Sequence, residues 1–180
     1  SVYKVPALPD RDAYALDVLS TILSGGKSAR LYRRLVHERK MALSAWAAYD
    51  GLNLGPGLFY LAGTPTPGTP VEKLEKALLD EIEAIRRQAP SEREVQKAKN
   101  QTEAQFVMEQ DSIYMQAKTI GMFEATVGWR AIDAYLEGIR SVTAADVQRV
   151  ARTRLLAERK TTGILVPEKG RRNVQAEEEG

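Results

Sequence analysis

The order in which strand-like and helix-like hydrophobic patterns follow one another is the feature that most restricts the fold of this chain. Residues 2–5 alternate apolar and polar side chains, which is typical of a short strand. Residues 10–23 then place apolar side chains at helical spacing and are followed by a glycine pair, which favours the end of a helix. A second, shorter helix is expected to begin at Ser28 as its N-cap and to run toward Glu38.

Two neighbouring antiparallel strands are expected next. Residues 42–49 and 58–62 are separated by glycine-rich and proline-containing turn sequences. The aromatic side chains of these strands are interpreted as core residues and cross-strand pairs, because no Lys or Arg lies among them to form a base-binding surface. They are Trp46, Tyr49, Phe59 and Tyr60.

Helical periodicity dominates most of the remaining chain. An apolar stripe beginning at Val71 predicts a helix that finishes before Pro90. The pairs Ser91/Glu94 and Thr143/Asp146 have the spacing of capping boxes, each of which opens a helix. Further helices are expected over 112–127 and 130–139, a last strand over 162–166, and a charged, solvated tail over 168–180.

This order predicts an α+β fold with a mostly antiparallel four-stranded sheet and helices packed on one face. A single domain over residues 1–167 is expected, because the chain shows no internal repeat. The 26 Lys and Arg against 24 Asp and Glu give a net charge of 26 − 24 = +2, which gives no support for nucleic-acid binding. No apolar run is long enough to span a membrane.

Few side chains in this sequence are able to hold a metal ion. The chain has no cysteine and one histidine, His37, so it contains neither a thiolate zinc site nor a helix of the HxxEH type. A basic cluster surrounds the expected short helix, and within it Arg30, Arg34 and Arg39 are the candidates for binding a carboxylate or phosphate group. The alternative is an exposed basic face that pairs with acids elsewhere in the chain.

Several segments carry a family resemblance through their order. They are residues 10–32, residues 35–42, Thr64-Pro65-x-Pro67-Gly68, residues 91–99 and residues 135–147. From about Val5 to Pro167 the chain resembles the C-terminal half of the pitrilysin/insulinase-type zinc metallopeptidases, a group that includes the mitochondrial processing peptidases.

The resemblance implies a protein built from two homologous α+β halves that face each other around a chamber. Zinc and the HxxEH motif belong to the N-terminal half, which this sequence does not contain, so no cofactor is expected in this chain. We expect the chain to be the inactive half, which closes the chamber and binds extended peptide beside a catalytic domain in cis or a partner subunit in trans. Bacterial proteins of this group are often exported, which favours the cell envelope over the cytoplasm.

One departure from the family pattern bears on activity. In active members an Arg and, seven residues later, a Tyr from this half help to polarise the scissile carbonyl. The matching positions here are Val36 and Leu43, neither of which can donate a side-chain hydrogen bond. The chain alone is therefore predicted to be inactive, with Arg34 or Arg39 as possible replacements for the missing guanidinium. A purely structural or assembly subunit without proteolysis stays open as the alternative.

Overall fold

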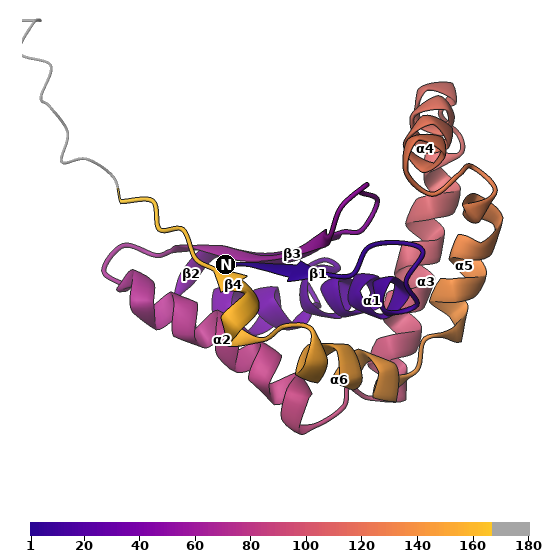
Figure 1. The fold of residues 1–180 in the computed structure, drawn as a ribbon. Coiled ribbons are helices and arrows are strands. Elements are labelled where there is room, and N and C mark those ends of the chain that lie inside the picture. Colours follow the sequence, from indigo (N-terminus) through magenta and orange to yellow (C-terminus); the bar gives the residue numbers. More distant parts are fainter. Residues whose placement is uncertain (167–180) are drawn as a thin grey trace, which may run out of the picture.

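The computed structural model describes residues 1–166, in which four antiparallel strands form one sheet (Figure 1). The strand order is β2-β3-β1-β4, so β1 lies between β3 and β4 and β2 forms one edge. Strands β2 and β3 form a hairpin, and β1 pairs with β3 so that Tyr3 is opposite Phe59. The strands are β1 (Val2–Val5), β2 (Ala42–Asp50), β3 (Gly57–Pro65) and β4 (Lys160–Thr161).

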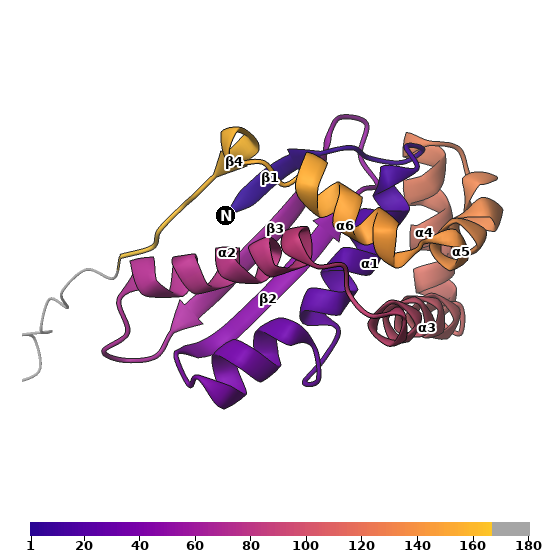
Figure 2. The same cartoon turned by 90° about the horizontal axis from the view of Figure 1, so that it is seen from below.

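Helices α1, α2 and α6 cover one face of this sheet, as Figure 2 shows from below. Helix α3 packs against α1, and α5 packs against both. The α+β fold with a four-stranded antiparallel sheet that the sequence predicts is therefore confirmed. The helices are α1 (Asp12–Ser24), the π-helix η1 (Tyr32–Glu38), α2 (Val71–Arg87), α3 (Glu92–Glu109), α4 (Ile113–Thr126), α5 (Ala131–Ser141), α6 (Ala144–Thr153) and the 3₁₀-helix η2 (Ala157–Arg159).

The core lies between the sheet and these helices. Alternate strand residues such as Val5, Phe59 and Leu61 point toward the helices and are buried, as the period of two along a strand requires. Leu16 and Leu19 of α1 are fully buried against them. Burial of each such side chain stabilises the fold by about 1.5–3 kcal/mol, so this layer holds the sheet and helices together.

Both predicted capping boxes are present. The Ser91 hydroxyl accepts a hydrogen bond from the Glu94 backbone N–H, and the Glu94 carboxylate accepts one from the Ser91 backbone N–H. Thr143 and Asp146 make the same reciprocal pair at the start of α6. These bonds satisfy backbone donors that have no partner within the helix, which explains why α3 and α6 begin where the sequence predicts.

The expected last strand over 162–166 is wrong. Strand β4 covers only Lys160–Thr161, and the apolar side chains that follow, Leu165 among them, are exposed. The register places Thr161 opposite Val2, so β1 offers only Ser1 to continue the pairing. Apolar composition predicted a strand, but a strand also needs a partner of matching length. The tail expected over 168–180 lies outside the described residues.

The expected N-cap at Ser28 is also wrong. Ser28 lies in a turn, where its hydroxyl binds the Lys97 ammonium group of α3 rather than a backbone N–H of the following helix. The short helix that follows is largely a π-helix, with the Arg39 backbone N–H bonded to the Arg34 carbonyl at 3.0 Å. A contact from a distant helix therefore overrode a local capping signal.

The last turns of α3 and the whole of α4 rise past the sheet on the side that the helices leave uncovered (Figure 1). Phe123 is the buried residue of α4, whereas Ile113 and Tyr114 at its start are exposed. Among the helices of residues 1–166, none combines the length and the apolar character that a membrane crossing requires.

Candidate functional site

Two of the three candidate arginines are held by carboxylates of the same chain. The Arg30 guanidinium donates two hydrogen bonds to Glu94, at 2.8 and 2.9 Å, and the Arg30 side chain is only 12% exposed. Arg34 donates from Nη1 to the buried Glu81 at 2.7 Å. Arg39 follows η1, is exposed and forms no ion pair with any acid among residues 1–166. The structure thus separates two tethered arginines from one that faces solvent.

The Arg30–Glu94 pair has a clear electrostatic signature. The hydrogen bonds from Arg30, and to a lesser extent those from Ser91, lower the pKa of Glu94 to about 2 although partial burial opposes this shift. The carboxylate is therefore ionised across the physiological range. A bidentate Arg–carboxylate contact of this kind fixes both position and orientation, so it attaches the turn before η1 to the first turn of α3.

Val36 and Leu43, the two positions that the family resemblance matches to an Arg and a Tyr, flank the junction of η1 and β2. Val36 is half-buried on η1 and packs against the core. Leu43 is 62% exposed and lies where the pairing of β2 with β3 shifts register between Ala42 and Ser44. A π-helix and a β-bulge often occur next to functional sites, because both change the direction of a side chain. Here they place two apolar side chains, which can bind apolar groups but cannot stabilise an oxyanion.

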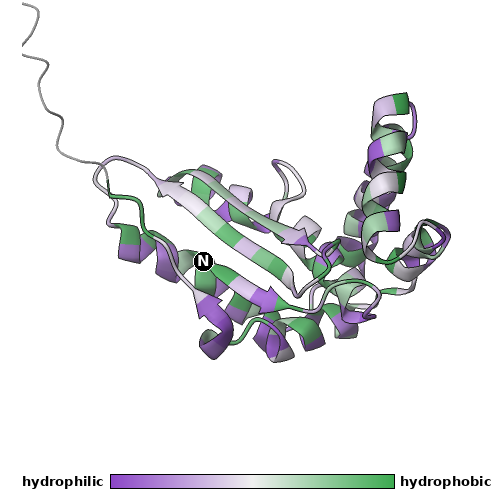
Figure 3. Cartoon of the chain, turned by 45° about the horizontal axis from the view of Figure 1, so that its top comes forward, coloured by the Kyte–Doolittle hydropathy of each residue, from purple (hydrophilic) through white to green (hydrophobic). Residues whose placement is uncertain are grey.

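The face of the sheet opposite the helices is uncovered (Figure 3). Trp46 points to this face because its neighbours Ala45 and Ala47 are buried on the helix side, and its side chain is 44% exposed beside Ala62. Trp46 is therefore not the core residue that the sequence predicts, whereas Tyr49 and Phe59 form the expected cross-strand pair. The assignment of Trp46 failed because strand alternation, and not side-chain type, decides which face a residue occupies.

Comparison with known protein families shows which family this chain belongs to. The family model described as the peptidase M16 inactive domain matches residues 2–102. The chain is a member of this M16 inactive-domain family. The expected resemblance to the pitrilysin-like zinc proteases is therefore confirmed.

Individual relatives of this M16 inactive domain agree with the assignment. The zinc protease PqqE of Helicobacter pylori is 27% identical over 165 residues, which cover 92% of this chain and 37% of the relative. The α subunit of the mitochondrial-processing peptidase of Neurospora crassa is 28% identical over 163 residues, which cover 81% of this chain and 28% of the relative. This chain thus spans only 37% and 28% of the lengths of these two curated relatives.

A solved structure matches along almost the whole length of both chains. It is the inactive peptidase domain of a zinc protease from Bordetella parapertussis, with a TM-score of 0.85 and 25% identity over 96% of this chain and 92% of that chain. The M16 inactive domain therefore adopts this same architecture in a relative whose structure has been determined as a domain.

The described part of this domain contains no cluster of side chains suited to bind zinc. Among residues 1–166, no group of three or more His, Asp or Glu side chains is arranged to hold a metal ion. His37 is the single histidine of the sequence, and one imidazole is too few for the ligand sets of known zinc peptidases. Near one edge of the sheet, the segment from η1 through β2 presents an exposed tryptophan, an exposed leucine and an arginine that forms no ion pair among residues 1–166.

Proposed function

We propose that this chain is the non-catalytic half of a zinc metallopeptidase, closing the chamber and binding extended peptide substrate with the uncovered face of its sheet. Zinc and the HxxEH motif are supplied by the other half of the protein or by a partner subunit. The domain that does this comprises residues 1–167.

The observation that carries this proposal is the uncovered sheet face bearing Trp46. An antiparallel sheet with one solvated face is common, but such a face is ordinarily polar. Here Trp46 and Leu43 are both exposed on the same strand, with Trp46 opposite Ala62 and Leu43 at the register shift near Thr64 and Pro65. Exposed apolar side chains grouped on one surface are typical of interaction sites. Extended peptides present apolar side chains and backbone groups, which such a surface can bind.

Among the three candidate arginines, we assign substrate contact to Arg39 and a positioning role to the others. Arg39 is exposed and forms no ion pair among the described residues, so it is able to bind a peptide carbonyl or carboxylate without losing an internal contact. Arg30 and Arg34 would have to leave Glu94 and the buried Glu81 first. If Arg34 left Glu81, the buried Glu81 carboxylate would lose its ion-pair partner, which would reduce the stability of the fold.

A purely structural or assembly subunit is the second candidate, and one observation favours it. Val36 and Leu43 cannot supply the hydrogen bonds that the family's Arg and Tyr supply. A domain that has lost both donors is suited to hold a complex together through the same surface without taking part in cleavage.

Peptide binding by the chain itself is the direct test of the first proposal. The sequence contains two tryptophans, so Trp129→Phe leaves Trp46 as the single fluorescent reporter on the uncovered face. Titration with an extended, unstructured peptide is expected to shift and saturate the Trp46 emission. Trp46→Phe is the matched control, because it leaves Trp129, which is similarly exposed at 43% but lies between α4 and α5. Equal responses from both variants, or none from either, would contradict binding at the sheet.

Cleavage assays separate the peptidase from the structural subunit. The chain alone is expected to cleave nothing. Peptide cleavage that appears only when the homologous catalytic half is present, and that a zinc chelator abolishes, would support the first proposal. In that assembly Trp46→Ala is expected to raise KM several-fold, whereas Trp129→Ala leaves it unchanged. Stable association of the two halves without any cleavage would favour the structural subunit.

Restoring the missing donors tests the assignment of Val36 and Leu43. In the assembled protein, the double variant Val36→Arg and Leu43→Tyr is expected to raise kcat, because a guanidinium and a phenol would again face the scissile carbonyl. Each single variant is the control. No gain in kcat from the double variant, with an unchanged circular dichroism spectrum, would show that these positions do not face the reacting bond.

A further inference from the structure

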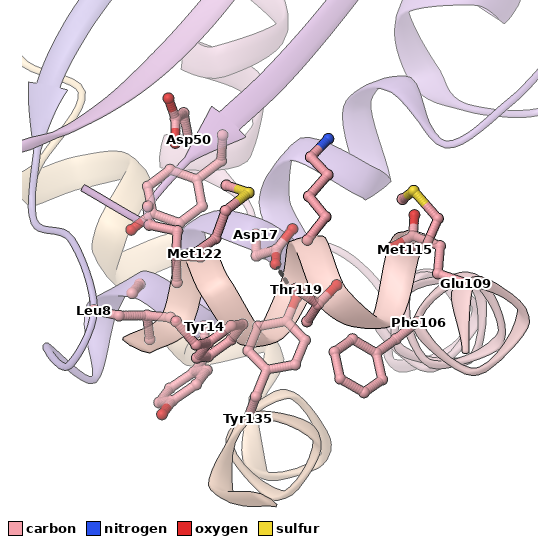
Figure 4. A pocket seen from close by; sticks show the side chains of 16 residues that line it. Leu8, Tyr14, Asp17, Asp50, Phe106, Glu109, Met115, Thr119, Met122 and Tyr135 are labelled. Carbon is pink, nitrogen blue, oxygen red and sulfur yellow. Dashed lines mark hydrogen bonds between the residues drawn. The ribbon is translucent and has the colours of Figure 1, made fainter. Parts of the chain in front are cut away.

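A pocket of about 320 Å³ lies where α1, the end of β2, α3, α4 and α5 meet (Figure 4). Pockets that bind small molecules begin at about this volume, and they are mostly apolar with a few polar groups. The walls fit that description. Six of the side chains that line it are Tyr14, Phe106, Met115, Met122, Phe123 and Tyr135.

The carboxylate of Asp17 lies closest to the aromatic side chains of this pocket, through its hydrogen bond with Tyr135. Asp17 of α1 lines the pocket, and Tyr135 of α5 donates a hydrogen bond to its Oδ2 atom. No described residue donates a hydrogen bond to Oδ1, yet no side-chain polar atom in the described chain is both buried and unpartnered. Oδ1 is therefore not fully buried, and Asp17 lines this pocket and a neighbouring one formed with Ala47, Gln101 and Glu109. Burial raises the pKa of Asp17 even though the Tyr135 hydroxyl opposes this shift.

Aromatic rings surround this carboxylate. The Tyr135 ring lies 5.3 Å from that of Phe106 and 6.2 Å from those of Tyr14 and Phe123, measured between ring centroids. Faces of clustered aromatic rings attract cations, and a carboxylate in an apolar environment is stabilised by one. The combination of an acid with several aromatic faces is suited to an ammonium or guanidinium group. The thioethers of Met115 and Met122 provide adaptable surface for an apolar stem.

The other charged groups around the pocket favour the same ligand. Asp50 and Glu109 line it together with Asp17, and Lys118 is the single basic residue among the lining side chains. Lys118 is exposed and forms no ion pair with a described acid, so it does not neutralise Asp17. The Tyr49 hydroxyl is already bonded to the Pro6 carbonyl at 2.7 Å. The Oδ1 atom of Asp17, which is not fully buried, is therefore left for a ligand.

We propose that this pocket binds a cationic nitrogen on an apolar stem, with Asp17 pairing the charge and the aromatic side chains enclosing the stem. A lysine or arginine side chain of a peptide and a free small amine share this chemistry. The inference does not depend on the proposed function, because the pocket would bind such a group whether or not the sheet lines a peptidase chamber.

The test compares a cation with its neutral counterpart on the full 180-residue chain. Backbone amide NMR shifts are followed during titration with benzylamine and, separately, with benzyl alcohol. Saturable shifts at residues 14, 17, 119 and 135 are expected for benzylamine, with affinity about tenfold above that for benzyl alcohol, the range of a charge-assisted hydrogen bond. No saturable binding, or equal binding of the two probes, would overturn the proposal.

Variants distinguish a binding role of Asp17 from a structural one. Asp17→Asn is expected to abolish the preference for benzylamine while still binding benzyl alcohol, which shows that the pocket is intact. Tyr135→Phe removes the internal hydrogen bond but keeps the charge, so it is expected to retain the preference. Asp80→Asn is the charge-matched control, because Asp80 is an exposed acid on α2 that pairs with Lys76. A preference that survives in Asp17→Asn, or is lost in Asp80→Asn, would refute the assignment.

Blocked tripeptides identify the source of the cation. Acetylated and amidated Gly-Lys-Gly and Gly-Arg-Gly carry the charge only on a side chain, and Gly-norleucine-Gly is the neutral control. Binding of the first two and not of the third identifies a peptide side chain as the ligand. Binding of benzylamine without either tripeptide identifies a free amine. Equal binding of all three tripeptides would contradict recognition of the charge.

Discussion

Replacement of Glu94 by glutamine removes the charge that holds Arg30 while keeping the side-chain length. The carboxylate of Glu94 accepts two hydrogen bonds from Arg30 and one from the Ser91 backbone N–H. Glutamine at this position can still complete a capping box, so the substitution mainly removes the ion pair between the turn before η1 and helix α3.

The size of the effect follows from the pKa of Glu94. Its value of about 2 in the fold, against an ordinary 4.5, corresponds to at most about 3 kcal/mol of stabilisation at neutral pH. The Glu94 side chain is 37% exposed, so solvent screening reduces this figure. We expect a loss of about 1–2 kcal/mol in the free energy of unfolding, or about 2–8 °C in Tm for a chain of this length.

The pH dependence gives the prediction its sign. A carboxylate whose pKa is lowered by folding stabilises the fold above its ordinary pKa, and this stabilisation is lost as pH falls through the folded value. The difference between the wild type and Glu94→Gln should therefore be constant above about pH 5 and shrink as pH falls from about 4.5 toward 2. Urea unfolding followed by circular dichroism at several pH values measures it.

Glu92→Gln is the matched control, because Glu92 lies in the same first turn of α3, is exposed and forms no ion pair among the described residues. It is expected to change stability by about 0.5 kcal/mol or less. Equal effects of the two substitutions at neutral pH, or a difference that does not shrink in acid, would refute the reasoning that Arg30 is held by the Glu94 charge.

Three further substitutions test the packing on which the site depends. Asp12→Asn should cost about 2–4 kcal/mol in urea unfolding, because the buried Asp12 carboxylate accepts hydrogen bonds from Arg149 and Arg154 at 2.6 Å each; a loss below about 0.5 kcal/mol would contradict this. Phe59→Ala should cost about 3–5 kcal/mol in the same assay, since Phe59 is fully buried beneath the sheet, and an unchanged Tm would disprove its central place in the core. Thr143→Ala should cost about 1 kcal/mol, whereas Thr143→Ser should retain most of the stability; equal losses would exclude the capping role.

The sequence predicts the elements of the fold better than their contacts. The helical stripe beginning at Val71 and the capping boxes at Ser91 and Thr143 are local signals, and each marks a helix that the structure contains. The strand expected over 162–166 failed because its length depends on β1, a partner about 160 residues away. The exposure of Trp46 was missed because alternation along β2 outweighs side-chain type.

In the candidate site, too, the sequence indicated individual residues but not their contacts. Sequence clustering singled out Arg30 and Arg34, but it did not reveal that Glu94 and Glu81 bind them, since those carboxylates lie 64 and 47 residues away. The pocket around Asp17 was missed altogether. Its visible signal was a carboxylate in the middle of the amphipathic helix α1, and its partner Tyr135 is 118 residues away.

By itself the sequence determined the α+β class and the lack of a multi-histidine zinc site, which follow from residue type and local spacing. The order of its motifs carried the family resemblance, and the match of Val36 and Leu43 to the family's Arg and Tyr is what that resemblance implies. The tertiary structure decided which candidate arginine has no ion pair among residues 1–166, which face of the sheet is uncovered and which carboxylate lines an aromatic pocket. Each of these depends on what distant segments place beside a side chain, because burial and ion pairing are set by packing rather than by position along the chain.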